Sequence, residues 1–163
     1  MEQENTFNNQ GSVYNLEKAL KKKNPFRNTW HRCIVNIVFT NGWVCEKVKD
    51  HFAPFGLTMK QYNVLRILNG ADTPLTTSAI RDRMIERGSD TSRIVERLHK
   101  KGLVHRSICP SDKRLVDVTI SKKGIALVDE VANHSSKLDE IVNNKLTEEE
   151  SIQLNNILDK LRS

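Results

Sequence analysis

Apolar residues recur with helical spacing between residues 28 and 52. The stripe consists of Trp30, Ile34, Ile37, Val38, Val44, Cys45, Val48 and Phe52. Positions three or four residues apart share one face of an α-helix, and Pro54 and Gly56 interrupt the pattern. We therefore predict one long helix over 28–52. A shorter helix is predicted over 13–23, and residues 1–12, which are polar and aperiodic, are predicted to form a flexible arm.

Three capping signals predict the starts of shorter helices. Thr58 with Gln61 three residues later forms a capping box, and the helix it opens ends at Asn69-Gly70. Thr76 is expected to cap a helix over 77–85. Ser89 is expected to cap another over 90–101, because Gly102 follows a last turn that contains two lysines. Two short helices separated by a turn are typical of a helix-turn-helix.

After residue 102 the spacing of apolar residues is no longer helical. Residues 103–108 and 115–120 are both predicted to form strands, and residues 115–120 place apolar side chains at alternate positions, as a half-buried strand does. The intervening segment 109–114 combines turn-forming residues with charged ones. This pattern predicts a β-hairpin with a basic tip, so the fold class is mainly α with a small β-hairpin.

Amphipathic helices are predicted from residue 122 to the end of the chain. Ser121 is expected to cap the first of them, and Thr147 and Glu150 form a second capping box. The final apolar stripe consists of Leu154, Ile157, Leu158 and Leu161. It needs a covering surface, either within a helical hairpin or, as we favour, against the first long helix and a second copy of the chain.

Charge is distributed unevenly along the 163 residues, a length that suits one compact domain with an arm. Residues 76–114 hold ten Lys/Arg and five Asp/Glu, whereas residues 115–163 hold six and nine, and the net charge of the chain is +6. A basic segment followed by an acidic one is typical of a nucleic-acid-binding protein, although a solvated helix face is the alternative.

Several classes of protein are disfavoured by the residue content. The mean hydropathy of −0.53 and the lack of a long apolar run argue against a membrane protein, and the polar start argues against a signal peptide, so a cytoplasmic location is expected. The five histidines and three cysteines lack metal-ligand spacing, and the seven glycines do not form a phosphate-binding loop. No catalytic residue, metal or cofactor is therefore expected, and the protein is not expected to be an enzyme.

The ungapped stretch 56–124 resembles the winged helix-turn-helix of MarR-type transcriptional regulators. The resemblance rests on the segments Gly56–Leu65, Leu75–Ile80, Ser92–Arg106, Pro110–Arg114 and Val118–Gly124. It implies an N-terminal arm over 1–27 and a single MarR-type domain over 28–163. Within that domain, residues 28–55 and 125–163 would supply dimerisation helices around the DNA-reading part, 56–124.

The resemblance also implies how such a domain reads double-stranded DNA. The second helix of the motif would enter the major groove, and the hairpin, or wing, would place an arginine in the minor groove. The predicted DNA-binding residues are Ser89, Asp90, Thr91, Ser92, Arg93, Arg97, Lys113 and Arg114. Capping alone is the alternative role for Ser89 and Thr91. Asp112 is expected to brace Arg114 by limiting its rotamers.

The implied function is that of a sequence-specific, ligand-responsive repressor that binds a pseudo-palindromic operator as a homodimer. Its effector would be a small aromatic or anionic compound. Trp30, Trp43 and Phe52 could line the effector site, although core packing is the favoured role.

Two other functions remain open at the level of the sequence. One is a thiol-based redox sensor, although Cys33 and Cys45 lie in an apolar stripe and are expected to be buried, while Cys109 lies in the hairpin. The other is a winged-helix protein-interaction module that has lost DNA binding. Retention of several arginines at the predicted interface argues against the second.

Overall fold

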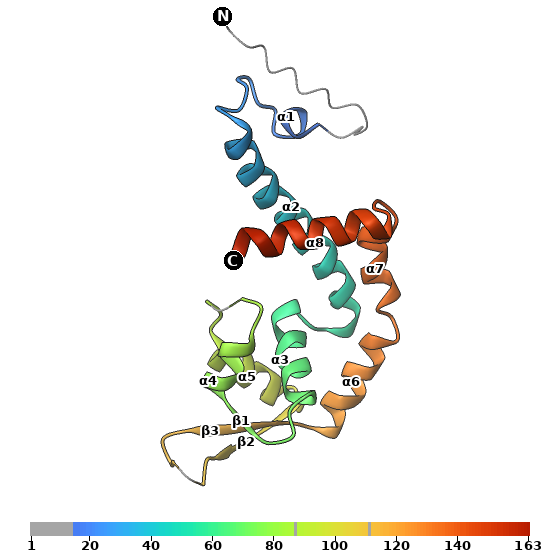
Figure 1. Cartoon of the computed structure of the whole chain (residues 1–163). Coiled ribbons are helices and arrows are strands. Elements are labelled where there is room, and N and C mark those ends of the chain that lie inside the picture. Colours follow the sequence, from blue (N-terminus) through green and yellow to red (C-terminus); the bar gives the residue numbers. More distant parts are fainter. Residues whose placement is uncertain (1–14, 87, 111) are drawn as a thin grey trace, which may run out of the picture. The chain divides into compact units, whose positions relative to one another are not determined.

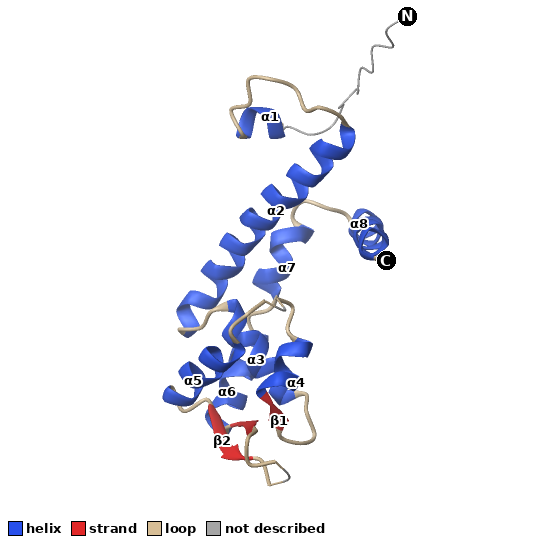
Figure 2. Cartoon of the chain, turned by 90° about the vertical axis from the view of Figure 1, so that its left-hand side faces the viewer, coloured by secondary structure: helices blue, strands red, loops and turns tan. Residues whose placement is uncertain are grey.

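The protein is predominantly helical and carries one small antiparallel sheet, as the sequence pattern predicts (Figures 1 and 2). The computed structural model describes residues 15–163 except 87 and 111, so the predicted arm over 1–12 lies outside the described residues. The chain divides into two units, Met1–Trp43 and Val44–Ser163. The elements are α1 (Leu16–Ala19), α2 (Thr29–Phe52), the 3-10 helix η1 (Ala53–Phe55), α3 (Met59–Asn69), β1 (Leu75–Thr76), α4 (Thr77–Arg83), α5 (Thr91–Lys100), β2 (Val104–Ile108), β3 (Val116–Ile120), α6 (Lys122–Ala132), α7 (Ser136–Asn143) and α8 (Glu148–Arg162).

The two N-terminal helices differ in how well the sequence predicts them. α2 covers the predicted long helix, whereas the helix predicted over 13–23 is confined among the described residues to the single turn of α1. The prediction that Cys33 and Cys45 are buried is wrong, since both are exposed on α2. Of the three aromatic residues assigned to the core, Phe52 is buried, but Trp30 and Trp43 are exposed. The reason is that the apolar stripe of α2 is left uncovered over much of its length in the single chain.

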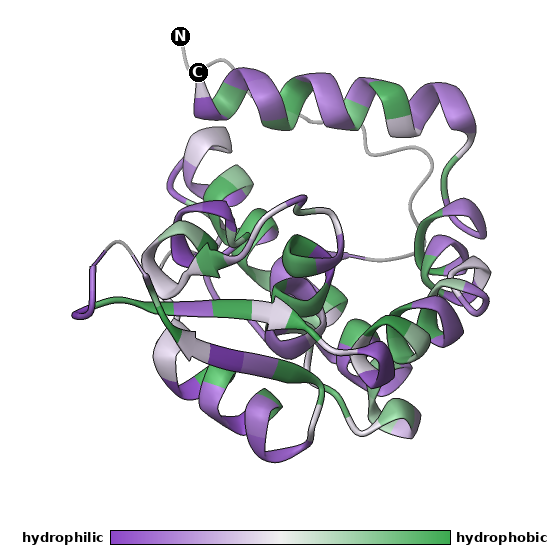
Figure 3. Cartoon of the chain, turned by 90° about the horizontal axis from the view of Figure 1, so that it is seen from below, coloured by the Kyte–Doolittle hydropathy of each residue, from purple (hydrophilic) through white to green (hydrophobic). Residues whose placement is uncertain are grey.

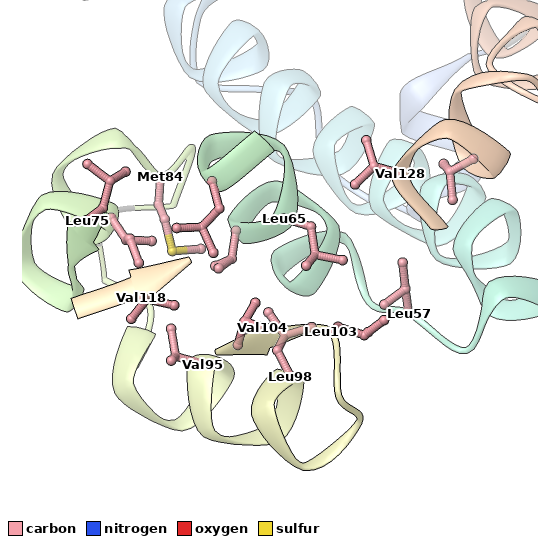
Figure 4. Close-up of a cluster of buried hydrophobic side chains, with 14 of the residues drawn as sticks. Leu57, Leu65, Leu75, Met84, Val95, Leu98, Leu103, Val104, Val118 and Val128 are labelled. Atoms are coloured by element: carbon pink, nitrogen blue, oxygen red, sulfur yellow. The ribbon is translucent and has the colours of Figure 1, made fainter. Parts of the chain in front are cut away.

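The winged-helix part is assembled around a core shared by α3, α5 and the sheet. The Thr58–Gln61 capping box opens α3, and the Thr76 side chain caps α4, both as predicted. Figure 4 shows side chains from these elements meeting in one apolar cluster. Its fully buried members are Val64, Leu65, Ile80, Val95, Leu98, Val104, Val118, Val128 and Val131. Burial of this apolar surface stabilises the arrangement of α3, α4, α5 and the sheet.

Three strands, rather than the two predicted, form the sheet in the order β1-β3-β2. β2 and β3 are the predicted hairpin, paired antiparallel from Val104↔Ile120 to Ile108↔Val116. β1 contributes only two residues, Leu75 and Thr76, which pair with Val118 and Asp117. A strand of two residues has no sequence period, so only its partner defines it.

The C-terminal part consists of three helices. Ser121 caps α6 by accepting a hydrogen bond from Gly124 N at 3.0 Å, and Thr147 with Glu150 forms the predicted capping box of α8. Apolar and polar residues alternate along α8, the long helix that ends at the C-terminus in Figure 3. Four of its apolar side chains are exposed: Ile152, Leu154, Ile157 and Leu161. None of the helices over the described ranges 15–86, 88–110 and 112–163 is both long and apolar enough to cross a membrane.

Candidate nucleic-acid interface

Helix α5 begins at Thr91, and Asp90 rather than Ser89 is its N-cap. The Asp90 carboxylate accepts a hydrogen bond from Arg93 N at 3.2 Å and pairs with Arg93 Nε at 3.1 Å. The prediction that Ser89 caps this helix is therefore wrong by one residue. A carboxylate at this position also opposes the positive end of the helix dipole.

The two faces of α5 have separate roles. Val95 and Leu98 are buried against the core, and Ile94 is half-buried, as predicted. The opposite face exposes Ser92, Arg93, Arg97 and Lys100. The side chain of Arg93 is 79% exposed although it contacts Asp90. An exposed basic face on a rigidly packed helix can enter a major groove without disturbing the core.

Ser89 and Thr91, by contrast, face inward. Thr91 is only 4% exposed, and its hydroxyl donates to Met84 Sδ at 3.5 Å and to Ser89 O at 3.4 Å. The Ser89 hydroxyl is buried without a hydrogen-bond partner within the part of the chain that the structure describes. These two side chains cannot reach DNA in this conformation, so the candidate interface is reduced to the six exposed members of the predicted set.

Two side chains of α3 contact the turn between α4 and α5, and the sequence analysis did not predict these contacts. Asn63 Oδ1 accepts a hydrogen bond from Ile85 N at 3.1 Å, and Lys60 Nζ lies 2.8 Å from Glu86 Oε2. Both contacts join residues more than twenty positions apart, so no local sequence motif predicts them. They hold in place the segment that leads into the first turn of α5.

The wing carries further exposed cations. At the hairpin tip, Arg114 Nε donates to Asp112 Oδ1 and Arg114 Nη2 donates to Asp112 Oδ2, both at 3.1 Å. Asp112 Oδ1 also accepts from Arg114 N at 2.9 Å, while 89% of the arginine side chain remains exposed. These bonds favour the charged carboxylate, so the Arg114 guanidinium lowers the pKa of Asp112. Asp112 and Arg114 are thus brought together as predicted, and Lys113 between them is exposed.

A separate cleft of about 350 Å³ lies between the end of α2 and helices α6 and α7. It is lined by Asp50, His51, Pro54, Phe55, Glu130, His134 and Lys137. The rings of His51 and His134 lie 5.9 and 5.5 Å from the ring of Phe55. Burial, followed by the positive charges of Lys137 and His134, lowers the pKa of His51. Its Nε2 is buried and has no hydrogen-bond partner among the described residues.

No group of three or more His, Cys, Asp or Glu side chains among the residues of the described ranges could hold a metal ion. Within residues 44–163, the α5–wing surface and the α2–α6–α7 cleft are the two candidate sites described above.

Comparison with known proteins shows which family and which solved structures the chain resembles. A model of the MarR family matches residues 55–115. The chain is 29% identical over 107 residues to the HTH-type transcriptional regulator MhqR of Bacillus subtilis (strain 168), covering 64% of this chain and 72% of MhqR. The chain is thus similar to transcriptional regulators of the MarR family, and the match with the family model covers its winged-helix part. The resemblance drawn from the sequence is thereby confirmed.

Solved MarR-family structures share the fold. A MarR variant from E. coli in complex with operator DNA superposes with a TM-score of 0.70 at 22% identity, covering 91% of this chain and 99% of that one. The organohalide-sensing regulator RdhR, in its 2,4-dichlorophenol-bound form, superposes with a TM-score of 0.75 at 21% identity, covering 86% of each chain.

The MarR-family match runs from η1 to the wing, so it contains α5 and the Asp112–Arg114 pair but neither α1 nor the C-terminal helices. All the predicted DNA-binding residues lie inside it.

Proposed function

We propose that the protein is a homodimeric repressor that binds a pseudo-palindromic operator through α5 and the wing of each subunit. The observation that carries this proposal is the Asp112–Arg114 pair, in which an exposed guanidinium is held at the tip of a hairpin beside an exposed basic helix face. A pre-oriented arginine suits a narrow minor groove, because less side-chain entropy is lost on binding.

In the proposed complex α5 lies in the major groove. Arg93, at the first turn of the helix, is placed to donate two hydrogen bonds to a guanine, and Ser92 beside it can reach a base edge or a phosphate. Arg97 and Lys113 contact phosphates. Asp90 acts indirectly, since its carboxylate caps the helix and orients Arg93.

Two copies of the chain are proposed to pair through their outer helices. α2 exposes Trp30, Ile34 and Val38, and α8 exposes Ile157 and Leu161. A soluble monomer rarely leaves so much apolar surface in water, and a twofold partner would cover it. The pair of winged helices would then read two successive major grooves.

The α2–α6–α7 cleft is the proposed effector site. Phe55 and Pro54 offer an apolar wall, and His51, His134 and Lys137 offer hydrogen-bond donors and positive charge. This chemistry suits a small aromatic or anionic compound, and RdhR, which shares the fold, is known in a 2,4-dichlorophenol-bound form. A ligand that favours one spacing of the two DNA-reading parts would shift the population away from the DNA-binding state. A regulator of transcription with this mechanism would act in the cytoplasm, where the DNA is.

A thiol-based response is the second candidate, because Cys33 and Cys45 are exposed on α2 and accessible to oxidants. Loss of operator binding on mild peroxide treatment, reversed by a thiol reductant and absent in C33S/C45S, would favour it. Unchanged binding would exclude it.

The deciding experiment is selection of genomic DNA fragments by the purified protein, followed by titration of a selected duplex at several salt concentrations. If roughly six to ten phosphates are contacted per dimer, affinity falls by about three to five decades between roughly 50 and 200 mM salt. A salt-independent signal, or no enriched sequence, contradicts the proposal and favours a protein-interaction module.

A further inference from the structure

A second strongly basic segment of the protein lies outside the winged helix. Residues 15–32 contain six Lys/Arg and one Glu. Even when Glu2 and Glu4 are included, the first 32 residues hold six Lys/Arg against three Asp/Glu. This segment precedes the MarR-family match, which starts at residue 55, and the proposed DNA-reading surface does not use it.

The segment has a defined local structure. Asn15 caps α1 by accepting a hydrogen bond from Lys18 N at 3.1 Å, and the side chain of Leu16 is buried. After α1 the chain reverses through Lys21, whose φ is +50°. Asn28 then accepts from His31 N at 2.8 Å at the start of α2. The cations between these caps are therefore carried on a folded turn.

Side-chain contacts fasten this turn to the start of α2. Arg32 Nε lies 2.9 Å from Glu17 Oε1, and the resulting hydrogen bond lowers the pKa of Glu17. Lys22 Nζ lies 5.0 Å from the centre of the Phe26 ring, which in turn packs edge-on against His31 at 5.5 Å. The one acidic group of residues 15–32 is thus already paired with Arg32.

Four cations are left pointing into solvent. Lys18, Lys21, Lys23 and Arg27 are exposed, and none forms an ion pair with a described residue. Clusters of like charge repel one another, so such a cluster on a folded turn is stabilised when a polyanion binds it.

We propose that residues 15–32 are a second DNA-binding element, in which Lys18, Lys21, Lys23 and Arg27 contact phosphates without reading bases. The proposal rests on the proposed function, because it adds contacts to the same duplex. Lysine is a compact charge on a flexible stem, which suits phosphates rather than base edges, and three of the four residues are lysines. DNA is favoured over other anions because the protein's family acts in transcription regulation and phosphate contacts supply most of the non-specific affinity.

The test compares two variants with the same change in charge. In the arm variant K18Q/K21Q/K23Q/R27Q the four exposed cations are removed. In the control K47Q/K49Q/K145Q/K160Q four exposed lysines of α2, the α7–α8 connection and α8 are removed. Affinity for a selected operator and for an unrelated duplex is measured by fluorescence anisotropy over a range of salt concentrations.

The arm variant is expected to lose at least about tenfold in affinity for both duplexes, with an unchanged ratio between them. Each lost phosphate contact lowers the slope of log affinity against log salt by about 0.9, so the slope is expected to fall by at least about 2 per dimer. The control is expected to keep the wild-type slope.

Three results would overturn the proposal. An arm variant with the wild-type slope, while the wild-type protein binds DNA, rejects the arm and leaves the proposed function intact. A weakened dimer with the wild-type slope would instead assign the cations to the acidic C-terminal helices of a second copy, which hold eight of the twenty Asp/Glu. Absence of duplex binding by the wild-type protein rejects both proposals.

Discussion

Gly124 lies directly against the backbone of Leu103: a Cβ on Gly124 would come within 2.3 Å of the Leu103 carbonyl oxygen and 2.7 Å of Ile120 Cγ1. That same carbonyl accepts a hydrogen bond from Ser121 N at 3.0 Å. The Ser121 hydroxyl donates to Gly102 O at 2.7 Å. The start of α6 is therefore bonded to the segment that follows α5, the helix proposed to read DNA.

Gly124→Ala is expected to destabilise the protein by about 1–3 kcal/mol, because a methyl group at this position overlaps backbone atoms that cannot move aside cheaply. Urea unfolding at fixed protein concentration measures the change. Gly88→Ala is the matched control, since nothing described lies within 4 Å of a Cβ at that position. Equal stability of the two variants would contradict the close packing.

Arg114→Ala is expected to weaken operator binding at least about tenfold without lowering the melting temperature. The arginine side chain is 89% exposed, and surface ion pairs contribute little to folding. Asp112→Asn is expected to give a smaller loss, because the guanidinium is retained and only its orientation is relaxed. Anisotropy titrations and thermal melts of the three proteins decide the point. Wild-type affinity in Arg114→Ala would remove the wing from the mechanism.

The assignment of Asp90 as the N-cap of α5 gives a prediction about stability. Asp90→Ala removes the side chain that accepts from Arg93 N, so a loss of about 0.5–2 kcal/mol in the free energy of unfolding is expected. Ser89→Ala is expected to be neutral or slightly stabilising, since its buried hydroxyl lacks a partner among the described residues. Denaturant unfolding of both variants checks the assignment, and the reverse order of stability would restore Ser89 as the cap.

The sequence predicts best those features that depend on neighbouring residues. The capping boxes at Thr58 and Thr147 and the pairing of Asp112 with Arg114 are local hydrogen bonds, so residue type and spacing are sufficient. The choice between Ser89 and Asp90 could not be made this way, because both are good caps and only tertiary packing buries Ser89.

Features that join distant segments were inaccessible to the same reasoning. β1 is a strand only because Leu75 and Thr76 pair with β3. Likewise, the cleft brings His51 together with His134, and the Asn63–Ile85 hydrogen bond crosses from α3 to the turn before α5. None of these contacts leaves a periodic signal in the sequence.

His51 makes stability depend on pH. Burial, with Lys137 and His134 nearby, lowers its pKa in the folded protein below the ordinary value of 6.5. Between the two values the unfolded chain binds more protons, so stability is full above about pH 6.5 and is lost as the pH falls toward the folded pKa. Melting temperatures measured from about pH 8 to 5 are expected to fall less steeply in His51→Gln than in the wild type. The same change at exposed His105 should leave the profile intact, and identical profiles for His51→Gln and the wild type would refute the assignment.

The exposed apolar face of α8 predicts which substitution would disrupt the proposed dimer. Ile157 is 64% exposed in the single chain, and Leu154, Leu158 and Leu161 fall on the same side of the helix. Ile157→Arg would place a charge in the proposed interface, where its desolvation opposes association, so a shift from dimer to monomer at micromolar concentration is expected. Asn156→Arg, with the same added charge on the opposite side of α8, should remain dimeric. Sedimentation velocity separates the two outcomes, and because a monomer presents only one winged helix, Ile157→Arg should also lose cooperative binding to a two-half-site operator. If Ile157→Arg sediments as the wild type does, α8 lies outside the dimer interface, and α2 alone would have to supply it.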